Sequence, residues 1–158
     1  MAYQRPGDSY FETQILTATP QKLRLMLIDG ALTYARWAAE HWQHGRIYEG
    51  GEAIAGCQNI VTELLRGLRP EEAPELVGKV AALYNFVFGS LIEAGLKRDA
   101  LKLNDAVTVL EIERETWRQV CEQLGSSLDD DARPQLRRSP HFLQHVDDLA
   151  SRGFSADA

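Results

Sequence analysis

The sequence has few of the features that mark several large classes of protein. Only two cysteines occur in 158 residues, Cys57 and Cys121, and each stands among apolar residues at helical spacing. We therefore expect two reduced core thiols, and the pattern does not imply a disulfide. Basic residues are outnumbered, at 17 Lys and Arg against 23 Asp and Glu, and the net charge of -6 argues against a nucleic-acid binder.

Signals for export or membrane insertion are also missing. The first ten residues, MAYQRPGDSY, are polar and lack the apolar stretch of a signal peptide. The apolar runs elsewhere are short and interrupted by charge, so we expect no membrane span and a cytoplasmic location.

Motifs that carry chemistry are lacking as well. We find no Walker loop, no nucleophile elbow and no glycine fingerprint for a dinucleotide. The four histidines form two pairs, His41 with His44 and His141 with His145, and neither pair has an obvious third ligand for zinc. The sequence therefore predicts no catalytic residue, no metal site and no cofactor.

The chain is instead rich in long amphipathic segments with helical periodicity. These cover residues 19–43, 47–67, 74–96 and 99–124. Thr19 and Asp99 are suitable N-caps, while Gly45 and Gly125 are suitable stops. Four such segments with short connections predict an all-α, antiparallel up-down four-helix bundle over 19–125.

Three further expectations concern the ends and the weak points of this bundle. An N-terminal arm, 1–18, precedes it, and a polar tail, 126–158, follows it with a short helix at 139–150. Gly50, Gly51 and Gly56 weaken the second helix, whose start should fray. Glu113 belongs to a charged group on the fourth helix that we expect to form local ion pairs.

The first and third helices carry more apolar surface than a bundle core requires, because each has two apolar stripes. On the first helix these are Leu23, Leu27, Gly30, Tyr34 and Trp37, and Leu25, Ile28, Leu32, Ala35, Ala39 and Trp42. On the third they are Leu76, Val80, Leu83, Val87, Leu91 and Ala94, and Val77, Ala81, Tyr84, Phe88 and Ile92. Periodicity alone leaves three explanations open. The surplus stripe is covered by the chain's own ends, forms a groove for a partner helix, or mediates dimerisation.

A set of blocks in fixed order is similar to one known family. The blocks are Tyr10 with Ile15-Leu16-Thr17-Ala18-Thr19-Pro20, Met26-Leu27-Ile28-Asp29-Gly30-Ala31-Leu32, Gln58-Asn59-Ile60-Val61-Thr62-Glu63-Leu64, Ala82-Leu83-Tyr84, Leu91-Ile92-Glu93-Ala94, Asp99, Leu110-Glu111 and Arg114-Glu115-Thr116-Trp117. Together they resemble the FliS family of flagellar secretion chaperones from about Tyr10 to Leu124. The departures are Gly50 and Gly51, a longer tail and a polar leader before Tyr10.

The resemblance implies a non-enzymatic, cytoplasmic four-helix bundle. Such a chaperone would bind the C-terminal segment of flagellin, prevent its premature polymerisation and pass it to the export gate protein FlhA. Our stripe assignment places the flagellin groove on Val77, Ala81, Tyr84, Phe88 and Ile92. The arm residues that match a groove cover are Tyr10, Ile15 and Leu16, and we expect a monomer or a weak homodimer.

A rival hypothesis comes from the segment His41-Trp42-Gln43-His44-Gly45. It is loosely similar to the motif of histidine phosphotransfer bundles, with His41 as the phosphorylated residue. Those proteins place that histidine in the middle of a helix and a lysine before the glycine. Here the segment falls at a predicted helix end, with His44 in the lysine position.

Overall fold

The computed structural model of the chain describes residues 18–128, and within them it confirms the predicted all-helical fold. The elements are α2 (Pro20–Gln43), α3 (Ile47–Arg66), α4 (Pro74–Lys97) and α5 (Ala100–Leu128). The predicted helices therefore agree with the observed ones to within a residue or two at most ends. The arm residues before 18 and the tail helix at 139–150 lie outside the described residues.

Three of the four capping residues predicted from the sequence, Thr19, Gly45 and Asp99, act at helix ends. The Thr19 hydroxyl accepts from the Lys22 N–H at 3.2 Å, and the Asp99 carboxylate accepts from the Leu101 N–H at 2.9 Å. Gly45 has a φ of 70°, the left-handed conformation that ends many helices at glycine. Gly125 was a wrong prediction of a stop, since α5 continues through it to Leu128. A helical glycine costs only about 1 kcal/mol and does not by itself end a helix.

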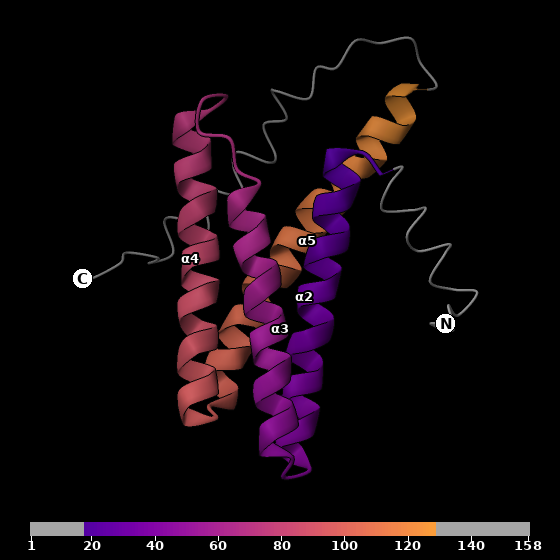
Figure 1. Cartoon of the computed structure of the whole chain (residues 1–158). Helices are drawn as coiled ribbons and strands as arrows, with labels where there is room; N and C mark the ends of the chain where they lie inside the picture. Colours follow the sequence, from indigo (N-terminus) through magenta and orange to yellow (C-terminus); the bar gives the residue numbers. More distant parts are fainter. Residues whose placement is uncertain (1–17, 129–158) are drawn as a thin grey trace, which may run out of the picture.

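The helices pack in a ring in which α2 contacts α3 and α5, and α4 also contacts α3 and α5. In Figure 1, α5 crosses behind the others, from beside α4 at one end to beside α2 at the other. The ion pairs follow this path. Lys102 at the start of α5 pairs with Glu93 of α4 at 3.5 Å, whereas Arg114 further along pairs with Asp29 of α2. The α3–α4 loop lies at the end where α5 has left α4.

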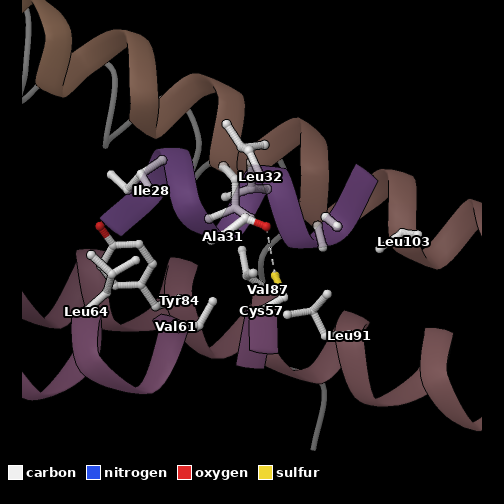
Figure 2. Close-up of a cluster of buried hydrophobic side chains, with 14 of the residues drawn as sticks. Ile28, Ala31, Leu32, Cys57, Val61, Leu64, Tyr84, Val87, Leu91 and Leu103 are labelled. Carbon is white, nitrogen blue, oxygen red and sulfur yellow. Dashed lines mark hydrogen bonds between the residues drawn. The ribbon is translucent and has the colours of Figure 1, made fainter. Parts of the chain in front are cut away.

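The core lies between the facing stripes of all four helices, and Figure 2 shows its centre. Cys57 is buried there, and its thiol donates to the Ala31 carbonyl at 3.3 Å. Burial raises the pKa of this thiol to about 12, so Cys57 stays protonated. Neither cysteine forms a disulfide, as expected, but Cys121 is only partly buried and is not a core thiol.

The glycines of α3 have a packing function that helix propensity does not reveal. A Cβ on Gly50 would lie 2.3 Å from Nε1 of Trp42, and one on Gly56 would lie 2.6 Å from the Tyr34 ring. Both rings belong to α2, so these glycines let α2 and α3 approach closely. The structure shows regular helix from Ile47 onward, where we expected fraying.

Helix α4 is long and apolar enough, by length and composition, to be a candidate membrane span, the only such helix in residues 18–128. One such helix is weak evidence, because the core helix of a bundle passes the same test. The stripe that includes Leu83, Val87 and Leu91 is buried within the bundle.

Two neighbouring glycines give a matched test of this packing. Gly50→Ala should lower the free energy of unfolding by about 1–3 kcal/mol, because the new methyl group overlaps the Trp42 ring. The methyl group of Gly51→Ala would have no atom within 4 Å. Because alanine favours helix more than glycine, this substitution should raise the free energy of unfolding by up to about 1 kcal/mol. Urea titrations followed by circular dichroism measure both, and changes of the same sign would contradict the packing explanation.

Candidate partner-binding surface

The structure separates the two stripes of α4. The first stripe, from Leu76 to Ala94, faces the core and is buried except for Leu76, which is partly exposed. In the second stripe, Val77, Ala81 and Phe88 are partly exposed and Ile92 is 41% exposed. We call these four residues the outer row.

Tyr84 does not belong to the outer row, although its spacing placed it there. Its side chain is 0% exposed, and it belongs to the same core cluster as Leu64 and Ile28, which Figure 2 shows near its ring. Its hydroxyl donates to the Glu113 carboxylate of α5 at 2.9 Å and accepts from Arg24 of α2 at 3.3 Å. Tyr84 therefore cannot contact a partner in this conformation, and its assignment to the groove is corrected.

Glu113 was also misassigned, because it is 1% exposed rather than part of a surface ion-pair group. Besides the Tyr84 hydroxyl, the indole N–H of Trp117 donates to its carboxylate at 3.3 Å. Burial, and then the charge of Glu113, raise the pKa of the Tyr84 hydroxyl. Tyr84 therefore keeps its proton and acts as a donor to a buried carboxylate.

The outer row lies along the junction between α4 and α3. A Cβ on Gly95 would lie 3.4 Å from the Ile54 side chain, so this side of α4 faces α3. Phe88 stands seven residues before Gly95 and Ala81 seven before that, which places both on nearly the same side of the helix. The partly exposed Leu65 of α3 is also packed against the core.

The surplus stripe of α2 lies on the other side of α3. Its Tyr34 contacts α3 at Gly56, and Tyr34 and Trp37 pack edge to face, with ring centroids 5.4 Å apart. Leu23 and Trp37 of this stripe are exposed. Two partly exposed apolar strips therefore flank α3.

A cavity of about 750 Å³ opens at the end of the bundle where α5 has moved away from α4. Its walls come from the start of α2, the end of α3, the α3–α4 loop and the start of α4, with Trp117 of α5. The apolar lining comprises Leu23, Leu27, Leu64, Leu68, Leu76, Val77 and Val80. Val77 thus connects the outer row to the cavity.

Several predicted residues fall elsewhere. Tyr10, Ile15 and Leu16 lie outside the described residues, as do His141 and His145. His41 lies in the last turn of α2 with its Nδ1 atom buried, not in mid-helix as in phosphotransfer bundles. Among residues 18–128 there is no group of three or more His, Cys, Asp or Glu that could hold a metal ion.

Comparison with known proteins gives a consistent result. The family model described as "Flagellar protein FliS" matches residues 2–124. The Flagellar secretion chaperone FliS of Bacillus subtilis is 31% identical over 119 residues, which cover 75% of this chain and 88% of the relative. The Salmonella typhimurium protein of the same name is 29% identical over 110 residues, 69% of this chain and 82% of the relative. Flagellar secretion chaperone FliSB of Pseudomonas aeruginosa is 27% identical over 106 residues, 67% of this chain and 84% of the relative.

A four-helix bundle with buried polar contacts at one end and a partly exposed apolar row on α4 is a fold suited to binding another helix. The chain belongs to the FliS family of flagellar secretion chaperones. The resemblance identified from the sequence blocks is therefore confirmed.

The Tyr84–Glu113 hydrogen bond can be tested by removing one oxygen atom. Tyr84→Phe should lower the free energy of unfolding by about 1–3 kcal/mol, because a buried carboxylate loses a donor. Tyr48→Phe removes the same atom from a side chain that is 75% exposed. This substitution should change the free energy of unfolding by less than about 0.5 kcal/mol. Equal effects of the two substitutions in urea unfolding would show that the buried hydrogen bond contributes little.

Proposed function

We propose that this chain is a cytoplasmic export chaperone that binds the C-terminal segment of flagellin. The observation that carries the proposal is the outer row, Val77, Ala81, Phe88 and Ile92, which is apolar, partly exposed and continuous with the cavity at Val77. By covering the apolar face of the segment, the chaperone would keep flagellin from polymerising. It would then pass the subunit to the export gate protein FlhA.

The length of the outer row suits a helical ligand. From Val77 to Ile92 the row extends about 22 Å, at about 1.5 Å per residue. A partner helix of about four turns, with apolar residues at spacings of three, four and seven, would match it. A segment that is disordered when free loses conformational entropy on binding, so it needs an apolar surface of this extent in return.

The N-terminal arm is the chain's own candidate for covering this surface. Pro20 and Gln21 at the start of α2 line the cavity, and the arm precedes them in the sequence. We propose that Tyr10, Ile15 and Leu16 cover part of the groove in the free protein and leave it when flagellin binds. Removal of residues 1–17 should then speed association with flagellin.

The groove assignment is tested by placing a charge on the outer row. Val77→Asp and Ile92→Asp should each weaken binding of flagellin about 100-fold, because an unpaired carboxylate would be buried under the ligand. Leu101→Asp is the matched control, since Leu101 is 79% exposed at the start of α5 and stands off the row. Isothermal titration calorimetry measures the affinities, and circular dichroism verifies that helical content is unchanged.

Two results would contradict this proposal. Flagellin that lacks its C-terminal segment should not bind, so undiminished co-purification of the truncated protein would refute the choice of ligand. If Val77→Asp and Ile92→Asp bind as tightly as Leu101→Asp, the groove lies on another face. Sedimentation of the free protein tests the expected monomer or weak homodimer.

A further inference from the structure

Arg24 is a cation held in the wall of an apolar cavity. It stands in the second turn of α2 and lines the cavity beside Leu23 and Leu27. Its guanidinium carbon lies 5.2 Å from the centre of the Trp117 ring and 6.0 Å from that of the Tyr84 ring. These two rings, from α5 and α4, restrict the orientation of the guanidinium group.

Only part of its hydrogen-bonding capacity is used within the bundle. Nη1 donates to the Tyr84 hydroxyl at 3.3 Å, and Nη2 donates to the Leu64 carbonyl in the last turn of α3 at 3.5 Å. A guanidinium group has five N–H donors, so several have no acceptor among residues 18–128. Within the described part of the chain Arg24 forms no salt bridge, and the Tyr84 hydroxyl, which accepts from Arg24, donates to the Glu113 carboxylate.

The charges around the cavity favour an anionic ligand group. Arg24, Arg66 and Arg69 line it, against Glu63 and Glu72. Arg66 and Glu63 pair with each other at 2.8 Å, whereas Arg24 is the lining cation that lies over the Tyr84 and Trp117 rings. The whole chain has a net charge of -6, so the excess of basic over acidic residues that line the cavity is opposite in sign to the net charge of the chain.

We infer that Arg24 binds a carboxylate of the docked flagellin segment, an Asp or Glu adjacent to the apolar side chain that fills the cavity. This inference rests on the proposed function and assigns the polar part of its recognition. The planar guanidinium offers two parallel N–H donors that match the two oxygens of a carboxylate. Since the surrounding rings already orient it, little side-chain entropy is lost on binding.

The decisive experiment is a set of double-mutant cycles between the chaperone and the flagellin C-terminal segment. Each Asp and Glu of the segment is replaced singly by Asn or Gln, and each peptide is titrated into the full-length chain and into its Arg24→Gln variant. We expect one acidic position at which replacement by the amide raises the Kd for the wild-type chain about tenfold. The same replacement should leave the Kd for the Arg24→Gln variant unchanged. Arg36→Gln is the matched control, because Arg36 also lies on α2 but pairs with Glu111 of α5, away from the cavity.

Arg24→Lys provides a second variant should Arg24→Gln fail to fold. Lysine keeps the positive charge but loses the bidentate geometry. The coupling between residue 24 and the same peptide position should therefore fall only in part. The wild-type interaction should also weaken between 50 and 300 mM salt more steeply than that of Arg24→Gln.

The outcomes separate the inference from the proposed function. If no acidic position couples to Arg24 while Val77→Asp weakens binding as proposed, the carboxylate assignment is wrong and the groove stands. If neither Arg24→Gln nor Val77→Asp affects binding, the assignment of the groove is itself wrong. If Glu12→Gln in the arm, rather than any substitution in the peptide, removes the effect of Arg24→Gln on binding, Arg24 binds a carboxylate of its own chain. The assignment to flagellin then fails.

Discussion

The hydrogen bond between the Tyr84 hydroxyl and the Glu113 carboxylate is the contact on which the open end of this bundle depends. A carboxylate that is 1% exposed requires donors, and Tyr84 of α4 and Trp117 of α5 provide them. Arg24 of α2 donates to the same hydroxyl and to the Leu64 carbonyl of α3. One polar network therefore connects all four helices at the end where α5 has crossed from α4 toward α2 (Figure 1).

This arrangement explains why a cavity and a partly exposed row occur together within residues 18–128. Along the first part of α5, the helix packs on α4 and closes the bundle, as the Lys102–Glu93 pair shows. Further along, α5 follows α2, as the Arg114–Asp29 pair shows, and there it contacts α4 through the Tyr84–Glu113 hydrogen bond while Trp117 lines the cavity. The network joins all four helices beside the opening, so the apolar groups around it are presented by a hydrogen-bonded frame. Such a frame suits a ligand that orders itself only on binding.

Much of the fold could be predicted from the sequence, because it depends on local signals. Thr19 and Asp99 cap helices through hydrogen bonds to residues two or three positions away, and the core stripes follow helical periodicity. The errors involve contacts between distant residues. Tyr84 has the spacing of the outer row, and only its partner 29 residues away on α5 shows that it is a core residue. Gly50 and Gly56 similarly reduce helix propensity, yet their importance lies in contacts with Trp42 and Tyr34 of another helix.

The central claim is that the α3–α4 side of the bundle contacts the flagellin C-terminal segment. A photo-crosslinking residue placed at position 92, and in a second protein at position 101, tests it most directly. Both side chains are exposed in the free protein, at 41% for Ile92 and 79% for Leu101. Accessibility alone would therefore give more crosslinks from position 101. We predict that crosslinks to the C-terminal segment form from position 92 and not from 101. Crosslinks from 101 alone, or equal yields from both, would contradict this account.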